Sequence, residues 1–149
     1  MVINFNPKYI PGDIVYNHKK EIIRITSSYL KGTKLFYYRD GECGWIREDA
    51  IKPIPLTPEI LEKNGWNKST GWSYVGSGKR GYQFSKELDD KWVELDRMTY
   101  GDLQICQCEN LRDWSYINEC NHYFRFEFTY VHELQHLLYA LHIDSNLKI

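Results

Sequence analysis

The sequence lacks long hydrophobic runs and has almost no net charge. None of its apolar stretches is long enough to span a bilayer, and no secretory hydrophobic segment follows Met1. We therefore expect a cytoplasmic protein without a membrane partner. Nineteen basic and 20 acidic residues give a formal net charge of −1. The chain as a whole thus has no basic field to attract nucleic acid, and a nucleic-acid partner is not expected.

Cysteine is sparse as well, with four residues in 149. Because no secretion signal is present, free thiols are expected. Cys106 and Cys108 alternate along a predicted strand and therefore point to one face. A structural zinc site could use four side chains spaced as C-x-C…C-x-H, namely Cys106, Cys108, Cys120 and His122. Zinc sites usually space their cysteine pairs as C-x-x-C, so buried thiols in a sheet are the simpler interpretation.

Aromatic residues, in contrast, are abundant: the chain has 12 Tyr, 6 Phe and 5 Trp. Dense Tyr and Trp favour β-sheet, and their flat rings with polar tips are common at binding sites. The hydrophobic fraction of 42% and the charged fraction of 26% are ordinary for a soluble folded protein. A length of 149 residues leaves room for one domain or two very small ones.

The segment 129–138 contains the pattern H-E-x-x-H. On a helix, His132 and His136 share one face and could bind one metal ion. Glu133 would then be the general base that takes a proton from a metal-bound water. This pattern is typical of zinc peptidases, and it makes a small zinc-dependent metallopeptidase the alternative function.

The geometry of the same helix argues against that function. At about 100° per residue, an apolar stripe forms from Val131, Leu134, Leu138 and Leu141. His132 and His136 lie roughly opposite this stripe, on the face that we expect to meet water. His142 would stand about 9 Å beyond His136 along the helix axis, too far to share a metal, because each residue rises 1.5 Å. The pattern therefore favours an amphipathic packing helix from 130 to about 142.

Residues 1–55 have the pattern of a small β-unit. A Pro-Gly-Asp turn at 11–13 precedes an apolar segment at 14–16, and strands are predicted over 21–26 and 34–38. Short strands separated by tight turns favour an SH3-like barrel or a curled sheet. The turns also carry Lys19, Lys20, Lys31 and Lys34. A nucleic-acid accessory protein could use these lysines, but solvated charge is the usual explanation.

Residues 56–149 form the second predicted domain. Its short first helix has Thr57 as the N-cap and Asn64-Gly65 as a left-handed C-cap. A β-meander is predicted between about 72 and 128, and the C-terminal helix is expected to cover one face of it. The predicted fold class is therefore α+β, with a small N-terminal SH3-like β-unit, a short helix, an antiparallel β-meander and a C-terminal amphipathic helix packed on the sheet.

Two polar segments, at 76–81 and 110–120, are predicted to be loops. The first is rich in glycine but lacks the strand and helix that flank a phosphate-binding loop, so a hairpin turn is the better interpretation. The second could be a recognition loop or an ordered connection. Rings for stacking and cations for phosphate contacts would hold a nucleotide ligand. The candidates for these roles are Trp72, Tyr74, Lys79, Arg80, Trp114 and Tyr116.

Three segments carry a family resemblance. They are a P-G-D-I-V start, an I-P-L-T entry to a capped helix ending in N-G-W, and a V-H-x-L-Q-x-L helix, at residues 11–15, 54–66 and 131–137. Together they resemble a family of small phage and prophage proteins of gut anaerobes, and the resemblance covers most of the chain. The similar family helix commonly carries Gln or Asn in place of Glu133 and His136. The resemblance thus implies a mobile-element setting but no particular reaction.

These observations lead to two functional hypotheses. The first is a non-enzymatic phage or prophage binding protein that inhibits host defence, either by blocking a host protein or by sequestering a small signalling nucleotide. No cofactor is expected in that case, and exposed aromatic residues could also serve a homo-oligomer. The second hypothesis is the zinc metallopeptidase, with His132 and His136 as metal ligands and Glu133 as the base.

Overall fold

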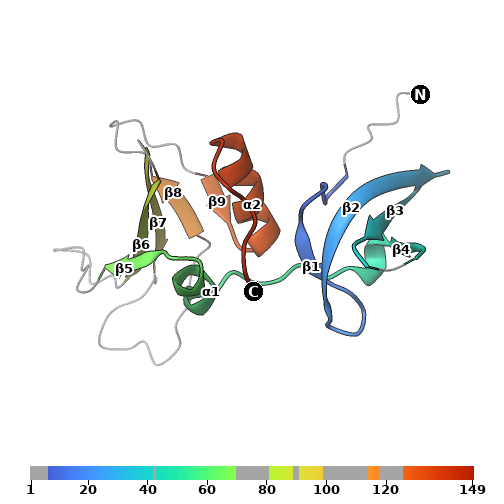
Figure 1. Ribbon diagram of the computed structural model, residues 1–149, viewed down its shortest axis with the longest axis horizontal. Helices are drawn as coiled ribbons and strands as arrows, with labels where there is room; N and C mark the ends of the chain where they lie inside the picture. The colour runs from blue at the N-terminus through green and yellow to red at the C-terminus, as the bar shows by residue number, and fades with distance from the viewer. Residues whose placement is uncertain (1–6, 42, 70–80, 89–90, 99–113, 118–125) are drawn as a thin grey trace. The chain divides into compact units, whose positions relative to one another are not determined.

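The computed structural model describes residues 7–41, 43–69, 81–88, 91–98, 114–117 and 126–149 (Figure 1). The chain forms two compact units. The N-terminal unit comprises residues 1–55 with 130–147, and the inserted unit comprises residues 56–129 with 148–149. The division after residue 55 coincides with the predicted boundary. The C-terminal helix, however, groups with the N-terminal unit, whereas the sequence assigned it to a domain spanning 56–149.

The N-terminal unit is built on a four-stranded antiparallel sheet whose strands follow sequence order. Its elements are β1 (Ile14–Tyr16), β2 (Ile22–Lys31), β3 (Lys34–Arg39), β4 (Trp45–Arg47) and the 3-10 turn η1 (Glu48–Ala50). A bulge between Ile25 and Ser27 bends β2 and helps the sheet to curl. The expected curled β-sheet and the mixed α+β class are confirmed.

The inner side of the curled sheet holds the core of this unit. The buried cluster comprises Tyr9, Val15, Ile23, Ile25, Tyr37, Ile46 and Ile51. The Tyr37 side chain is fully buried, and its hydroxyl donates to Glu48 Oε2 at 2.5 Å. The same hydroxyl accepts the backbone N–H of Tyr9 at 3.4 Å. These contacts tie η1 and the segment before β1 to the middle of the sheet.

Helix α2 (Val131–Ala140) belongs to this unit. Tyr130, directly before it, pairs with Pro55, and the Val131 backbone N–H donates to the Ile54 carbonyl at 2.9 Å. The helix contacts β1. Three of the four residues of its predicted apolar stripe are buried, because Val131 and Leu134 have no exposed surface and Leu138 is 2% exposed. The fourth, Leu141, follows the last residue of the helix and is partly exposed.

The inserted unit contains helix α1 (Pro58–Lys63) and a five-stranded antiparallel sheet in sequence order. The strands are β5 (Asn67–Ser69), β6 (Gly81–Leu88), β7 (Lys91–Met98), β8 (Trp114–Ile117) and β9 (Phe126–Phe128). The predicted caps of α1 are confirmed, since Thr57 Oγ1 accepts the Ile60 N–H at 3.4 Å and Gly65 has φ +78°.

The meander expected from the sequence is present in the inserted unit, but one predicted loop is wrong. Residues 114–117, within the polar segment 110–120, form β8 between β7 and β9. Trp, Tyr and Ile at these positions favour a strand, and this local preference is hidden by the polar residues around them. Neither of the described helices, α1 and α2, is long and apolar enough to cross a membrane.

Candidate functional site

The polar face of α2 lies against the Pro-Gly-Asp turn that precedes β1. Gln135 is buried there, and its Oε1 accepts the Ile14 backbone N–H at 2.9 Å. Its Nε2 donates to the carbonyls of Gly12 and Ser145 at 3.0 and 2.9 Å. A polar side chain can be buried without a large free-energy cost only when its hydrogen bonds are made. Gln135 therefore joins the helix, the turn and the C-terminal segment.

His136, the second histidine of H-E-x-x-H, is paired with Asp13. Its Nε2 lies 3.0 Å from Oδ1 and 2.8 Å from Oδ2. The Asp13 side chain is 2% exposed, and its Oδ2 also accepts the Ile10 backbone N–H at 2.8 Å. The His136 side chain is 31% exposed. This ring nitrogen is therefore engaged by a carboxylate from the turn.

His132, the first histidine of the pattern, is enclosed by other rings. It contacts Tyr9 edge-on at 5.0 Å between centroids, stacks on Tyr130 at 5.9 Å, and meets the His136 ring at 5.6 Å. Its Nδ1 is buried and has no hydrogen-bond partner among the described residues. Burial lowers the pKa of His132 from 6.5 to about 4, although Asp13 nearby opposes this shift. The ring is therefore neutral near pH 7.

The prediction that the two histidines face water is wrong. His132 is only 3% exposed, and His136 is 31% exposed and contacts Asp13 of the turn at 11–13. A helical wheel correctly separates them from the apolar stripe, but it describes one helix and cannot show a second surface that covers the polar face. Glu133 lies in the first turn of α2, where a carboxylate complements the helix dipole. His142 is exposed beyond the end of the helix.

A catalytic zinc ion needs three protein ligands that converge on one point. The turn brings Asp13 next to the two histidines, a third donor that the H-E-x-x-H spacing could not reveal. Both of its oxygens contact His136, however, and His132 is enclosed by Tyr9 and Tyr130. In the part of the chain that the structure describes, no group of three or more His, Cys, Asp and Glu is arranged to hold a metal ion. Among the described residues, these donors are therefore not arranged as a catalytic zinc centre requires.

The other residues predicted to bind ligand or metal are mostly outside the described residues. These are Trp72, Tyr74, Lys79, Arg80, Cys106, Cys108, Cys120 and His122. Trp114 and Tyr116 lie in β8, where they pair with Phe128 and Phe126 of β9. Of the residues predicted to bind a ligand, only Trp114 and Tyr116 therefore lie in the part of the chain that the structure describes.

A second feature of the N-terminal unit was not predicted from the sequence. It is the face of β2, β3 and β4 that points away from the core. Cross-strand partners lie on the same face of a sheet, so the register identifies the residues of this outer face. They are Ser27, Tyr29, Lys31, Lys34, Phe36, Tyr38, Trp45 and Arg47. The opposite face carries the buried Tyr37 and Ile46. The three strands contain five Lys or Arg and no Asp or Glu.

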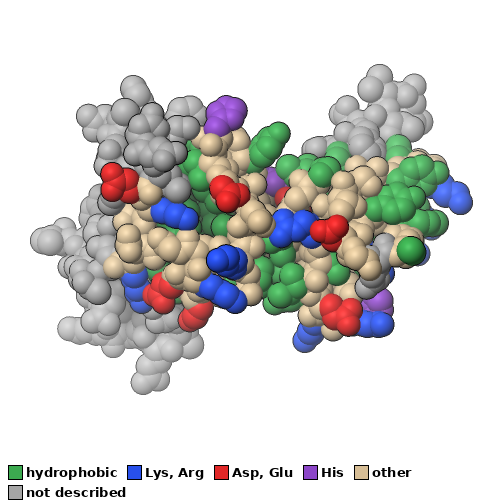
Figure 2. All heavy atoms as spheres, viewed as in Figure 1, with side chains coloured by type: hydrophobic (Ala, Val, Ile, Leu, Met, Phe, Trp, Pro, Cys, Tyr) green, Lys and Arg blue, Asp and Glu red, His purple; other side chains and the backbone are tan. Residues whose placement is uncertain are grey.

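Most aromatic rings of the outer face are accessible. Tyr29, Tyr38 and Trp45 are 47%, 41% and 47% exposed, whereas Phe36 is buried against Trp45 with ring centroids 4.0 Å apart. Figure 2 shows hydrophobic side chains at the surface over the β2–β3 hairpin, with basic side chains beside them. A cluster of large exposed rings is uncommon on a protein without a binding partner. The outer face therefore combines stacking surfaces with positive charge.

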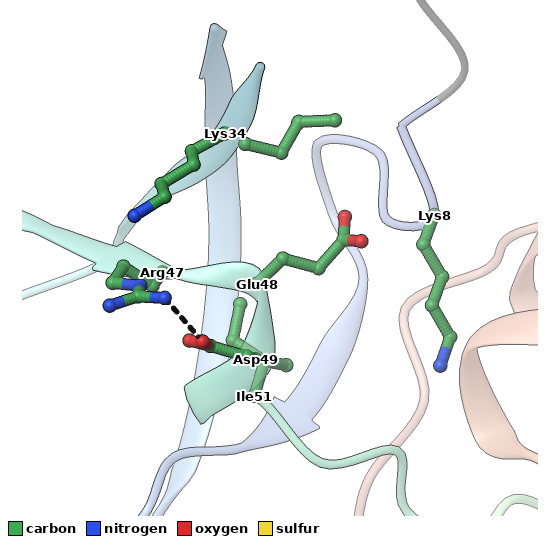
Figure 3. Close-up of a pocket in the computed structure, with 7 residues that line it drawn as sticks. Lys8, Lys34, Arg47, Glu48, Asp49 and Ile51 are labelled. Atoms are coloured by element: carbon green, nitrogen blue, oxygen red, sulfur yellow. Dashed lines mark hydrogen bonds and ion pairs between the residues drawn. The ribbon is translucent and has the colours of Figure 1, made fainter. Parts of the chain in front are cut away.

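A pocket of about 400 Å³ adjoins the outer face at Lys34 and Arg47 (Figure 3). The remaining lining residues are Lys8, Leu35, Glu48, Asp49 and Ile51. Both carboxylates are already engaged, because Glu48 accepts the hydroxyl of a core tyrosine and Asp49 pairs with Arg47 at 2.6 Å. Lys8, across the pocket, and Lys34 have no ion-pair partner within the described residues. Lys8 and Lys34 therefore place positive charge on two sides of the pocket.

Comparison of the chain with protein-family models, with curated proteins and with solved structures finds no match. Its function is therefore inferred from the geometry of the outer face and the adjoining pocket.

Proposed function

We propose that this protein is a non-enzymatic binding protein that holds a nucleotide ligand on the outer face of its N-terminal unit. Exposed rings of Tyr29, Tyr38 and Trp45 would stack on the base, and neighbouring cations would contact the phosphate. The observation that carries the proposal is the composition of this face, which pairs three half-exposed rings with positive charge and no carboxylate. In the mobile-element setting that the family resemblance implies, such a protein would sequester a signalling nucleotide used in host defence.

Electrostatics supports an anionic ligand at this place. The outer face carries three basic residues, Lys31, Lys34 and Arg47, and no acidic residue, while the whole chain has a net charge of −1. The rest of the chain is therefore net acidic, and positive charge is concentrated on one sheet. Lys31 and Lys34 are cross-strand partners and have no ion-pair partner among the described residues. Like charges placed opposite each other repel, and an anion between them removes that repulsion.

The pocket extends the positive surface beyond the sheet. Arg47 pairs with Asp49, but both side chains are more than half exposed, and an exposed ion pair contributes at most about 1 kcal/mol. A phosphate can therefore recruit this guanidinium at little cost. Leu35 and Ile51 supply an apolar wall to the same pocket. A volume of about 400 Å³ is within the range of small-molecule sites.

The proposal is tested by isothermal titration with nucleoside mono- and triphosphates, cyclic dinucleotides and a short oligothymidylate. We expect at least one probe to bind saturably, with an affinity that falls as salt rises. Trp45→Ala should weaken binding by about tenfold or more, since stacking on an aromatic ring contributes about 1–3 kcal/mol per base. Lys34→Gln should weaken it as well and reduce the salt dependence.

Two exposed residues of the same unit provide matched controls. Tyr139, 70% exposed near the end of α2, and Lys19, exposed in the turn before β2, are not on the outer face. Tyr139→Ala and Lys19→Gln should therefore leave the affinity unchanged. The proposal is wrong if no phosphate-bearing probe binds, or if Trp45→Ala binds as tightly as the unaltered protein. In the first case a host protein that covers the same rings becomes the hypothesis to pursue.

A further inference from the structure

Resting on this proposed function, we infer that the nucleotide ligand is a single-stranded oligonucleotide that places several consecutive nucleotides on the outer face, rather than a mononucleotide. The inference comes from the arrangement of rings and cations across three strands. A mononucleotide would need one ring and one or two cations. The outer face provides three exposed rings and three cations, and these are spread across three strands.

The register places the outer-face residues in rows. Lys31 and Lys34 are partners at the tip of the β2–β3 hairpin. Tyr29, Phe36 and Arg47 form the next row across the three strands. Ser27, Tyr38 and Trp45 form the third row. Positive charge therefore lies along the hairpin tip and at Arg47, and the exposed rings lie beside it.

The span of the rings exceeds one base. Tyr29 and Trp45 are two strands and one row apart, which corresponds to about 12 Å for strands about 4.8 Å apart and about 3.4 Å per residue. Stacked nucleotides follow one another at about 3.4 Å and are further apart when the strand is extended. Two or three consecutive bases could therefore meet Tyr29, Tyr38 and Trp45 while the phosphates run past Lys31, Lys34 and Arg47.

The chemistry of the face favours a single strand over a duplex and over a particular sequence. Bases inside a duplex are stacked on each other and cannot stack on protein rings. Ring stacking accepts any base, because every base has a π-face. Ser27 is the one outer-face residue that is neither aromatic nor basic, and the three cations are assigned to phosphate contacts, so few groups are left to read base edges. We therefore expect weak sequence preference.

The test measures affinity as a function of ligand length. Fluorescence anisotropy or isothermal titration would use thymidine monophosphate and oligothymidylates of two, four and eight nucleotides, together with a blunt duplex of the same length as the longest. We expect the affinity to rise at least tenfold from one to four nucleotides and then to level off, and the duplex to bind at least tenfold more weakly than the single strand.

Tyr29→Ala is the decisive variant, because Tyr29 lies at the far end of the rings from Trp45. It should weaken the four-nucleotide complex about tenfold and monophosphate binding by a clearly smaller factor, and Tyr29→Phe should restore the lost affinity by restoring the ring. Each of Lys31→Gln and Lys34→Gln should lower the slope of log affinity against log salt by about 0.7, the value for one phosphate contact on a single strand.

The failure of this inference can be told apart from failure of the proposed function. If thymidine monophosphate binds as tightly as the eight-nucleotide strand, or Tyr29→Ala affects both equally, the extended ligand is wrong and the nucleotide-binding function stands. If the duplex binds as tightly as the single strand, the rings do not contact bases and the inference is again overturned. If neither short nor long probes bind, the proposed function itself fails.

Discussion

Asp13 is the residue on which the polar contacts of the N-terminal unit converge. Its carboxylate accepts the Ile10 backbone N–H and contacts Nε2 of His136, and its side chain is 2% exposed. A buried carboxylate destabilises a fold unless it is paired and hydrogen-bonded. His136 is therefore needed to stabilise Asp13, and this structural role accounts for a histidine at that position of α2.

His132 predicts a dependence of stability on pH. Burial holds its pKa at about 4 in the folded protein, against 6.5 for the ordinary group, while Asp13 raises it and His136 and Lys8 lower it further. Below pH 6.5 the unfolded chain therefore binds a proton that the folded protein does not bind. The stability contributed by neutral His132 is complete above pH 6.5 and is lost as pH falls toward 4, by up to about 3 kcal/mol.

His132→Phe isolates this effect, because phenylalanine keeps a flat ring but cannot take up a proton. Nδ1 has no partner among the described residues, so the substitution should change stability at pH 7 by only about 1 kcal/mol. Urea unfolding at pH 7 and pH 5 should show a smaller loss of stability in the variant than in the unaltered protein. All other titrating groups are shared by the two proteins, and an identical loss in both would contradict the assignment.

At the scale of elements, α2 is held by its polar face as well as by its apolar stripe. Gln135 makes three hydrogen bonds, to the turn before β1, to the start of β1 and to the segment after the helix. Two of these partners precede Gln135 by more than 120 residues in the sequence. Gln135 therefore contributes a long-range connection that neither element could make alone.

Gln135→Met tests this connection. Methionine has a similar volume but cannot make the hydrogen bonds, so one N–H and two carbonyls near α2 lose their partner. We expect the free energy of unfolding to fall by about 3 kcal/mol, because an unsatisfied buried group costs about 1–3 kcal/mol. Chemical denaturation measures the change. Tyr139→Ala, on an exposed position of the same helix, should change stability by less than about 0.5 kcal/mol. Equal effects of the two substitutions would contradict the role of Gln135.

Structural features that depend only on residues close together in the sequence were predictable. The cap at Thr57, the left-handed Gly65 and the buried stripe at Val131 and Leu134 each depend on neighbours within a few residues. The candidate site was not predictable in this way. His136 meets Asp13 from 123 residues away, and a helix periodicity contains no information about that contact.

The outer face illustrates a second limit of sequence reasoning. Tyr29, Tyr38 and Trp45 are visible in the sequence as alternating aromatics, but such rings equally fill a core. Only the register of β2, β3 and β4 places them with Lys31 and Lys34 on the side opposite Tyr37. The lysines were assigned to turns because their position relative to the rings depends on pairing across strands.

At the scale of the whole molecule, the N-terminal unit is discontinuous in sequence. It contains residues 1–55 and 130–147, and Pro55 pairs with Tyr130 where the two parts meet. Leu56 and Thr129, at the limits of the inserted unit, are also joined by a backbone hydrogen bond of 2.9 Å. The chain thus leaves and re-enters the N-terminal unit at adjacent points, and this unit cannot be complete before its C-terminal segment is made.

A chain that ends at Thr129 should therefore lose the folded N-terminal unit, although residues 1–55 are all present. Asp13 would be left without His136, and the Ile14 N–H without Gln135. Hydrogen exchange followed by mass spectrometry should show loss of protection in β1 and at Lys52, which pairs with Tyr16. A chain that ends at Leu147 is the control, because it lacks only residues 148–149 of the inserted unit and should keep that protection. If the chain ending at Thr129 remains protected, residues 1–55 fold by themselves and the contacts of α2 are dispensable.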